Sequence, residues 1–491
     1  MNGPIRQLAT ALFVGLAVLV AAVTWIQVVQ ANEFRDDPRN TRVITARVGR
    51  ERGTIITADG VVAAMSAPNQ DDPQVFTRQY PEGDLYAHVV GYSTALFGDT
   101  GIEASRAAEL TSDRDSTISG VINALLGGDL RPQGLRLTVD HALQTTAYEA
   151  LAGQIGAVVA IDPTTGAVLA MASNPTFDPN LLTGFNAGPQ GAALENDPDR
   201  PLLNRAAQET YNPGSTFKTV TAAAALESGV AGPATPFPNE FRVELPGSTA
   251  TISNAGGRRC GDGATVTLTT AFVLSCNTVF AVLGIEVGPE ALVGQAEALG
   301  FNTEPATTDF RAVASAIPEA ASFENADAAL AQTAIGERDV RATPLQMAII
   351  AATVANGGQL MEPYLVAEVF NADAEVEETS APTPLGRAFS PATAEALSEM
   401  MEGVVTSGTG QRATVSGVRI GGKTGTAETP GDAPHAWFIG YGPVDAAPGE
   451  PQIAIAVLIE SGGAVGATAT GGTLAAPIAR AVLAEFFSNG S

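Results

Sequence analysis

The sequence predicts an α/β fold in which helices flank a central antiparallel sheet. A smaller mixed α+β module precedes this domain, and one transmembrane helix stands at the N-terminus. Three observations support this prediction. An uncharged apolar window lies between Arg6 and Glu33. Two β-branched runs around a Pro-Thr-Thr-Gly turn indicate a hairpin at Gly156–Ser173. Strand patterns at both ends of the larger region enclose a helix-rich centre, which is typical of an α/β domain closed by its own termini.

The apolar window predicts a membrane anchor. Residues Gln7–Asn32 form a window of 26 residues without a charge. As a helix this window would span about 39 Å, more than the bilayer hydrocarbon core of about 30 Å. We therefore expect a cytoplasmic tail at residues 1–6 and an anchor at 7–31. A cleaved signal peptide is the alternative, because residues 29–31 resemble a small-x-Ala cleavage site.

Charge placement alone does not predict the orientation of this anchor. The arginines that follow the window outnumber the one before it, and a simple positive-inside count would place them in the cytoplasm; they are Arg35, Arg39, Arg42, Arg47, Arg50 and Arg52. Long domains, however, translocate largely regardless of charge. We therefore base the orientation on the chemical motifs described below, and we expect the domains after the anchor to lie outside the cytoplasm.

The chain after the anchor divides at about residue 152. Short strand and turn patterns assign residues 32–152 to the mixed module and 153–491 to the larger domain. The acidic, proline-containing segment Ala372–Pro384 is expected to be a surface loop. In the larger domain the sequence predicts helices around 291–299, 345–355 and 474–487, and strands at 418–423, 436–442 and 452–459.

The composition limits the classes of molecule that this protein is expected to bind. The formal net charge is −26, so the surface should repel nucleic acid, and no nucleic-acid partner is expected. The histidines show no metal-ligand spacing, so we expect neither a metal nor another cofactor. Of the 26 cationic residues only Lys218 and Lys423 are lysines. Since lysine can lose its proton at accessible pH and arginine cannot, both positions are candidates for chemistry.

The first lysine stands three residues after a serine, Ser215. The Pro-Gly pair before Ser215 indicates a helix start, and residues three apart on a helix share a face. Near a helix N-terminus, backbone N–H groups favour developing negative charge. A serine nucleophile needs a base within hydrogen-bond reach, which a neutral Lys218 would provide. The alternative interpretation is a serine cap beside an exposed lysine.

A second motif is Ser275-x-Asn277, whose hydroxyl and carboxamide could relay a proton and hold a peptide group. This signal is weak alone, because any Ser-x-Asn could be a turn. The third motif, residues 423–426, follows an apolar strand pattern.

In this third motif a lysine and two threonine hydroxyls suit a substrate carboxylate, and flanking glycines leave room for a substrate; the residues are Lys423, Thr424, Gly425 and Thr426. A phosphate-binding loop is the rival interpretation, because Gly417–Gly422 followed by Lys-Thr matches that pattern. We disfavour it, since the enclosed run is β-branched and no helix pattern follows.

In this order the three motifs resemble those of the penicillin-recognising serine enzymes. Further segments resemble class B penicillin-binding proteins, and among them the actinobacterial A type; these segments are 52–53, 88–92, 101–103, 137–140, 162–166, 173–175, 178–180 and 203–206. Asn212 departs from the family pattern, which commonly has a second proline there. The resemblance implies a β-lactamase-like penicillin-binding transpeptidase domain after an N-terminal penicillin-binding-protein module.

The resemblance also implies an activity, that of a serine-type D,D-transpeptidase. Such an enzyme cross-links peptidoglycan stem peptides ending in D-Ala-D-Ala and is acylated by β-lactam antibiotics. Ser215 would attack the penultimate carbonyl, Lys218 would be the base, and Ser275 would pass a proton to the leaving amine. Asn277 would hold the donor peptide, and the N–H groups of Ser215 and Thr426 would form the oxyanion hole.

The N-terminal apolar helix implies the cytoplasmic membrane as a partner, and the resemblance implies a membrane glycosyltransferase and division proteins. Two alternatives stay open, a D,D-carboxypeptidase and a non-catalytic, wall-peptide-binding division scaffold. A class A β-lactamase is disfavoured, because it needs a carboxylate for deacylation. Between Asn277 and Lys423 no glutamate is followed by an asparagine four residues on.

The chain has two cysteines, Cys260 and Cys276. An even pair in an exported protein predicts a disulfide. Cys276 is the middle residue of the Ser-x-Asn motif, and Cys260 lies in a glycine- and arginine-rich loop, 256–261, that is flexible enough to reach it. We therefore expect a disulfide beside the site. Two buried, reduced thiols are the alternative.

Overall fold

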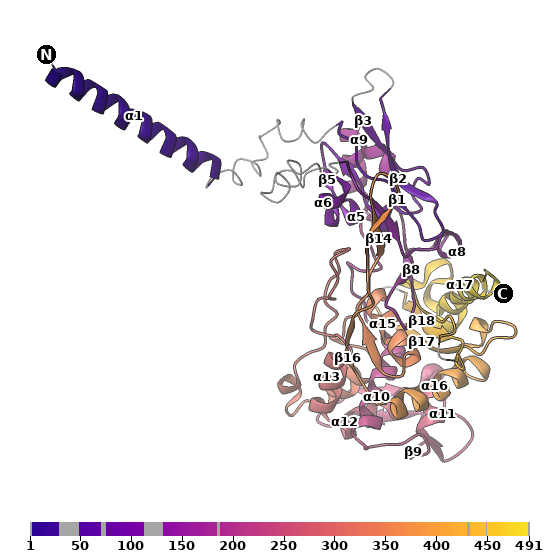
Figure 1. Ribbon diagram of the computed structural model, residues 1–491. Coiled ribbons are helices and arrows are strands. Elements are labelled where there is room, and N and C mark those ends of the chain that lie inside the picture. The colour runs from indigo at the N-terminus through magenta and orange to yellow at the C-terminus, as the bar shows by residue number, and fades with distance from the viewer. Residues whose placement is uncertain are drawn as a thin grey trace.

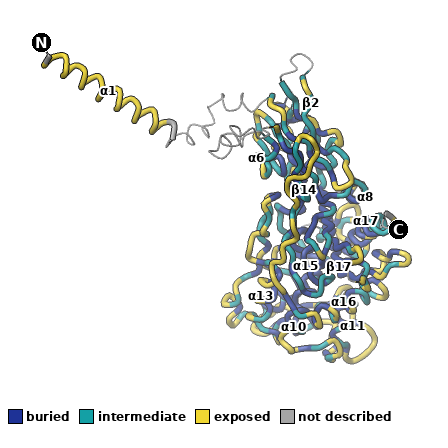
Figure 2. The backbone as a smooth tube through the Cα atoms, viewed as in Figure 1, coloured by how far each residue is buried: buried dark blue, intermediate teal, exposed yellow. Residues whose placement is uncertain are grey.

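The computed structural model describes residues 2–28, 49–69, 75–111, 131–183, 187–429, 433–447 and 449–489. An N-terminal helix, a small domain and a larger domain follow one another (Figure 1). Buried residues concentrate inside the larger domain and in the middle of the small one (Figure 2).

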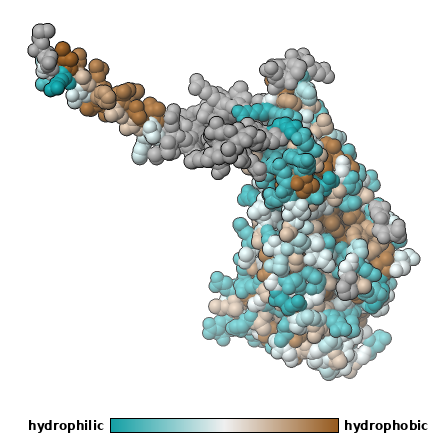
Figure 3. Space-filling view, viewed as in Figure 1, coloured by the Kyte–Doolittle hydropathy of each residue, from teal (hydrophilic) through white to brown (hydrophobic). Residues whose placement is uncertain are grey.

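The N-terminal helix α1 (Asn2–Val28) has the length and composition of a membrane span. Its segment Gly3–Ile26 has a mean hydropathy of 2.3, and none of it is buried against the rest of the protein. Figure 3 shows it as an almost continuous apolar rod. Residues 29–31, with the alternative cleavage site, and the arginines from Arg35 to Arg47 lie outside the described residues.

The larger domain is built on a five-stranded sheet in which every neighbouring pair is antiparallel, as the sequence analysis predicted. The strand order is β17-β18-β19-β7-β8, so the last strands of the domain pair with its first strands. Their bounds are β17 Gly421–Ala427, β18 His435–Gly442, β19 Ile453–Ile459, β7 Gly156–Ile161 and β8 Val168–Asn174. The predicted strand at 418–423 therefore starts later, because Val418 instead bridges back to Val415 in a turn.

The sheet separates two hydrophobic cores. Along β19, Ala454, Ala456 and Leu458 belong to one core and the alternate residues to the other, as the two-residue period of a strand requires. Because both faces are covered, β19 is apolar throughout (IAIAVLI). One core contains α15 (Pro344–Ala355) and α16 (Pro391–Thr406), and the other contains α8 (His141–Ala150) and α17 (Ala476–Asn489).

The remaining elements of the larger domain lie mostly on the α15 side of the sheet. The helices are α9 Ala187–Glu195, α10 Lys218–Glu227, α11 Leu268–Val273, α12 Asn277–Val287, α13 Pro289–Ala298 and α14 Asp327–Ala334. The short two-stranded ribbons pair β9 Pro236–Pro238 with β12 Thr265–Thr267, β10 Arg242–Glu244 with β11 Thr251–Ser253, and β13 Gln359–Met361 with β16 Pro384–Arg387.

The small domain contains a six-stranded sheet that includes two strands from late in the chain. Its order is β15-β14-β6-β1-β2-β3, with β15 Val376–Thr379, β14 Val366–Phe370, β6 Gly134–Leu137, β1 Ile55–Ile56, β2 Val62–Pro68 and β3 Phe76–Gln79. The short elements around it are β4 Ser93–Thr94, β5 Gly98–Asp99, α4 Ala87–Val90, α5 Gly101–Ser105 and α6 Ala107–Leu110.

The loop expected at Ala372–Pro384 is therefore wrong in part, because this segment contains β15 and the first residue of β16. All four residues of β15 are exposed, since it is an edge strand paired only with β14. An exposed, charged edge strand lacks the apolar alternation that identifies a strand in a sequence.

Asp309 fixes the chain where it returns from the larger domain to the small one. Its Oδ1 accepts a hydrogen bond from Arg106 Nε at 3.0 Å, and its Oδ2 accepts from the N–H groups of Leu365 and Val366 at 2.7 and 2.9 Å. The Asp309 side chain is only 2% exposed. A cavity beside it is lined in part by Arg106 and Tyr364.

We predict that Asp309→Ala lowers the free energy of unfolding by about 3–5 kcal/mol, because it leaves Arg106 and two N–H groups without their partner. Chemical denaturation measures the change. The matched control is Asp373→Ala, since Asp373 also pairs with an arginine but is 63% exposed, and its loss should cost about 0–1 kcal/mol. Equal losses in the two variants would contradict the role assigned to Asp309.

Candidate active site

Ser215 lies in a 3-10 helix, Gly214–Phe217, that leads directly into α10. The N–H of Gly214 donates to the carbonyl of Gly336 at 2.9 Å. Gly214 has a φ of +52°, and a Cβ there would lie 2.6 Å from the carbonyl oxygen of Thr426. A glycine is therefore required before Ser215, both for its backbone conformation and for the approach of β17.

The Ser215 side chain is half-buried. Within the part of the chain that the structure describes, its hydroxyl makes no hydrogen bond, so it is available to a ligand.

Lys218 is fully buried one turn after Ser215. Its ammonium nitrogen donates to the carbonyl of Ser275 at 2.8 Å and to Asn277 Oδ1 at 2.7 Å, and it lies 3.4 Å from Ser275 Oγ. Burial, and secondarily the like charge of Lys423, lower the pKa of Lys218 well below its usual range. The lowered pKa favours the neutral amine of Lys218, which can accept a proton.

Lys423 approaches the same hydroxyl from β17. Its Nζ donates to Ser275 Oγ at 2.9 Å and to the carbonyl of Thr424 at 3.0 Å. The side chain is fully buried, and burial lowers the pKa of Lys423 to about 7. Each lysine also lies over an aromatic ring, Lys423 over Phe272 at 5.5 Å and Lys218 over Phe280 at 5.6 Å. The two lysines of the chain thus meet at one serine hydroxyl.

Ser275 and Asn277 are held at the junction of α11 and α12. Ser275 has a φ of +60°, a conformation that few residues other than glycine adopt. Asn277 Nδ2 donates to the carbonyl of Ser253 at 3.0 Å, while its Oδ1 accepts from Lys218. Since a carboxamide has two N–H donors, one of them stays available on Asn277 for a ligand.

The strand β17 carries the third motif along the site. Thr424 is hydrogen-bonded through its hydroxyl to that of Thr409 at 2.6 Å. Gly425 packs against the segment before Ser215, where a Cβ would lie 2.8 Å from the Pro213 carbonyl oxygen. Thr426 is half-buried and follows directly. Side chains from all three motifs thus meet around Ser275, since Lys218 and Lys423 both bind its hydroxyl and Asn277 binds Lys218, whereas the Thr424 hydroxyl is paired with Thr409.

Sequence reasoning missed several residues at this site. Ser253 and Asn254 support Asn277 and the start of α12, since Asn254 Oδ1 accepts from the N–H of Thr278 at 3.0 Å. Glu337 lies at the end of β17, where its Oε1 accepts from the N–H of Glu428 at 3.3 Å. None belongs to a motif of fixed spacing, so the sequence offered no signal for them.

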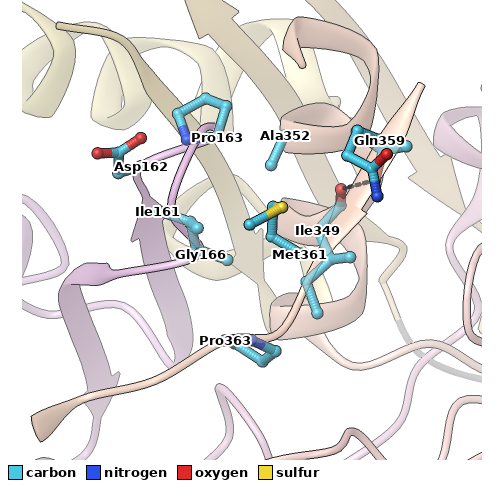
Figure 4. Close-up of a pocket in the computed structure, with 10 residues that line it drawn as sticks. Ile161, Asp162, Pro163, Gly166, Ile349, Ala352, Gln359, Met361 and Pro363 are labelled. Atoms are coloured by element: carbon cyan, nitrogen blue, oxygen red, sulfur yellow. Dashed lines mark hydrogen bonds between the residues drawn. The ribbon is translucent and has the colours of Figure 1, made fainter. Parts of the chain in front are cut away.

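A small cavity lies away from this cluster, between the turn after β7 and helix α15. Figure 4 shows Asp162, Pro163 and Gly166 on one side of it and Ile349 and Ala352 on the other. It contains none of the motif residues, and we assign it no chemistry.

Cys260 and Cys276 form a disulfide with a Cα–Cα distance of 6.0 Å. Cys276 is fully buried between Ser275 and Asn277, and Cys260 is 7% exposed. The N–H of Cys260 donates to Asn239 Oδ1 at 2.8 Å. The disulfide thus ties the 256–261 loop to the Ser-x-Asn motif, as the sequence analysis expected.

Two family models match the chain. Residues 156–484 match the penicillin-binding protein transpeptidase domain. The chain belongs to the penicillin-binding protein transpeptidase family. Residues 52–135 match the penicillin-binding protein A dimerisation domain. The small domain and the larger domain therefore both match models of penicillin-binding proteins.

Individual relatives agree with this membership. The chain is 40% identical over 506 residues to the peptidoglycan D,D-transpeptidase PbpA of Mycolicibacterium smegmatis, covering 100% of both proteins. It is also 40% identical to PbpA of Mycobacterium tuberculosis, with 98% of each covered. The ceftriaxone acyl-enzyme complex of penicillin-binding protein A from M. tuberculosis has 39% sequence identity and a TM-score of 0.82, covering 89% of this chain and 98% of that one.

We predict that replacing both cysteines by serine lowers the free energy of unfolding by about 3 kcal/mol, because a cross-link between residues 16 positions apart restricts the unfolded chain. Chemical denaturation with and without reductant measures it. Reductant should lower the stability of the unmodified protein and leave the double variant unchanged. A protein equally stable in both conditions would show that the cross-link contributes nothing.

Proposed function

We propose that this protein is a membrane-anchored serine D,D-transpeptidase that cross-links peptidoglycan stem peptides through an acyl-enzyme on Ser215. One observation carries the proposal. An available hydroxyl on Ser215 stands one turn before a buried lysine of lowered pKa, and both lysines of the chain converge on Ser275. The relatives named as peptidoglycan D,D-transpeptidases support the same activity.

In the acylation step, neutral Lys218 takes the proton of Ser215 as its oxygen attacks the penultimate carbonyl of a peptide ending in D-Ala-D-Ala. The N–H groups of Ser215 and Thr426 stabilise the oxyanion. Ser275, hydrogen-bonded to both lysines, passes a proton to the leaving D-alanine nitrogen. The C–N bond breaks and the Ser215 ester remains.

Substrate binding uses the groups around these atoms. Lys423 and the hydroxyls of Thr424 and Thr426 receive the terminal carboxylate, and Gly425 keeps the strand free of a side chain next to it. The free N–H of Asn277 holds a carbonyl of the donor peptide. β-Lactams would acylate the same serine, as in the acyl-enzyme complexes of the M. tuberculosis relative.

The location follows from the substrate. The helix α1 anchors the chain, and the catalytic domain lies outside the cytoplasm, where peptidoglycan is cross-linked. Partners would be a membrane glycosyltransferase and division proteins. A peptidoglycan synthase complex that couples polymerisation and cross-linking contains a chain with 26% identity and a TM-score of 0.72, which supports the first of these. A D,D-carboxypeptidase would use the same acyl-enzyme with water in place of an amine.

The test of this function is the acylated residue. A β-lactam should leave a stable adduct on the peptide that contains Ser215, located by mass spectrometry. Ser215→Ala should reduce acylation by on the order of 10⁴-fold or more, because it removes the nucleophile of a concerted unit. A variant that keeps more than a tenth of the original acylation rate would overturn the assignment.

Both lysines should resist replacement by arginine. Lys218→Arg and Lys423→Arg keep the charge but introduce a bulkier group that does not lose its proton. We expect each to reduce the acylation rate by on the order of 100-fold or more, the lower range of a lost acid–base contribution. The control is Arg419→Lys, an exposed cation paired with Glu402, which should change little. Unchanged acylation in both lysine variants would show that the lysines are incidental.

A further inference from the structure

The chain segment 336–342 runs antiparallel to the residues just before Ser215. The N–H of Gly214 donates to the carbonyl of Gly336 at 2.9 Å, and Tyr211 and Ala342 exchange two backbone hydrogen bonds of 2.9 and 2.8 Å. A Cβ on Gly336 would lie 2.0 Å from the carbonyl oxygen of Gly214. The backbone at 336 is therefore pressed against the nucleophile segment, and the next residue is Glu337.

Side chains add hydrogen bonds to this backbone pairing. Asn212 Nδ2 donates to the carbonyls of Arg338 and Val340 at 3.0 and 2.9 Å. Its Oδ1 accepts from Arg341. Asn212 is the position at which the chain departs from the proline common in its family. The amide connects the 338–341 stretch to the Ser215 segment, so the position of Glu337 is fixed from both sides.

The Glu337 carboxylate connects the 336–341 stretch to the end of β17. It is half-buried, and its Oε1 accepts from the N–H of Glu428, the residue after the last of β17. The Ser215 segment therefore lies between β17 and the 336–341 stretch, and Glu337 bridges the two. The acylation step described above has no use for this carboxylate.

The groups around Glu337 raise the pKa of its carboxyl group. Burial, and secondarily the like charge of Glu428, raise the pKa of Glu337 to about 7, against the opposing effects of its backbone hydrogen bond, Lys218 and Arg341. Arg341 is already engaged with Asn212, and Lys218 with Ser275 and Asn277. Among the described residues no cation forms an ion pair with Glu337, so this half-buried carboxylate can take up a proton near neutral pH.

We propose that Glu337 binds the acceptor amine of the cross-linking reaction and removes its proton. This inference rests on the proposed function and concerns its second half. The acceptor arrives as an alkylammonium cation, whose charge complements a carboxylate on the segment that pairs with the residues just before Ser215. The sequence pattern of a deacylating carboxylate is a glutamate followed by an asparagine four residues on. Glu337 does not match this pattern, because Arg341 stands at that position.

The step balances as follows. The ammonium transfers one proton to the Glu337 carboxylate, and the neutral amine attacks the ester carbonyl of acylated Ser215. A C–N bond forms, and the bond from the carbonyl carbon to the Ser215 oxygen breaks. The second proton of the attacking nitrogen reaches the Ser215 oxygen through Lys218. Glu337 then releases its proton to solvent, and both side chains return to their initial states.

The experiment separates the two halves of the reaction in the full-length protein. A thioester analogue of a donor ending in D-alanine acylates the enzyme, glycinamide is the acceptor, and the ratio of amide to hydrolysed product is followed between pH 5.5 and 9. Acylation by penicillin is measured on the same samples. Glu337→Gln removes the carboxylate, and Glu337→Asp keeps one. Asp339→Asn, an exposed carboxylate paired with Arg338 on the same stretch, is the matched control.

We expect Glu337→Gln to lose tenfold or more in amide formation, with a smaller loss in hydrolysis, and Glu337→Asp to recover part of it. The ratio of amide to hydrolysed product of the unmodified protein should rise as Glu337 ionises near pH 7, and Glu337→Gln should remove this part of the rise and leave the part due to the acceptor amine. Glu428→Gln should move the rise to lower pH, since removal of a like charge lowers the pKa of Glu337. Asp339→Asn should change neither the ratio nor the profile.

Three outcomes would overturn the proposal. Equal losses of amide formation and hydrolysis would show that Glu337 does not distinguish an amine from water. A loss of penicillin acylation as large as the loss of amide formation would assign Glu337 to the structure of the Ser215 segment. An unchanged pH profile in Glu337→Gln would exclude its titration from the step. None of these bears on Ser215 as the nucleophile, which the penicillin adduct tests separately.

Discussion

The site depends on two buried lysines that share one serine hydroxyl. Both Lys218 and Lys423 are removed from water, and both donate toward Ser275 Oγ. Two ammonium groups in such a place repel each other and lack the hydration that stabilises their charge. Burial lowers the pKa of both lysines, and the like charge of Lys423 lowers that of Lys218 further. The same burial that makes the pair costly therefore favours the neutral form of Lys218, which the proposed role as a base requires.

The surrounding structure holds this costly arrangement in place. The left-handed backbone of Ser275 costs on the order of 1–3 kcal/mol, and such a conformation persists only where its neighbours fix it. Here the N–H groups of Ser275 and Cys276 donate to the carbonyls of Phe272 and Ala271 at 3.1 and 2.8 Å. The disulfide holds Cys276, and the hydrogen bond from the N–H of Thr278 to Asn254 holds the start of α12. Aromatic rings replace part of the lost hydration of the lysines.

The features that could be predicted from the sequence were the local ones. The hairpin at 156–174 has two β-branched runs around a turn, and Ser215 and Lys218 are spaced by one helical turn, so each is visible in a short window. The return of β14 and β15 to the small domain was not predicted, because the pairing between Phe370 and Gly134 produces no recognisable sequence pattern in either segment. Glu337 was missed for the same reason, since its partner Glu428 lies 91 positions away.

The two domains are joined in a way that limits independent motion. The chain crosses between them after β6, again on the way to β14, and a third time between β15 and β16; Asp309 binds both the backbone that returns to β14 and Arg106 of the small domain. A domain connected by one linker can pivot, whereas three crossings and a buried ion pair resist rotation. The strand β14 therefore places a segment from the second half of the chain inside the sheet of the small domain. A displacement of the small domain would reach the 305–309 segment directly, through the ion pair between Arg106 and the buried Asp309.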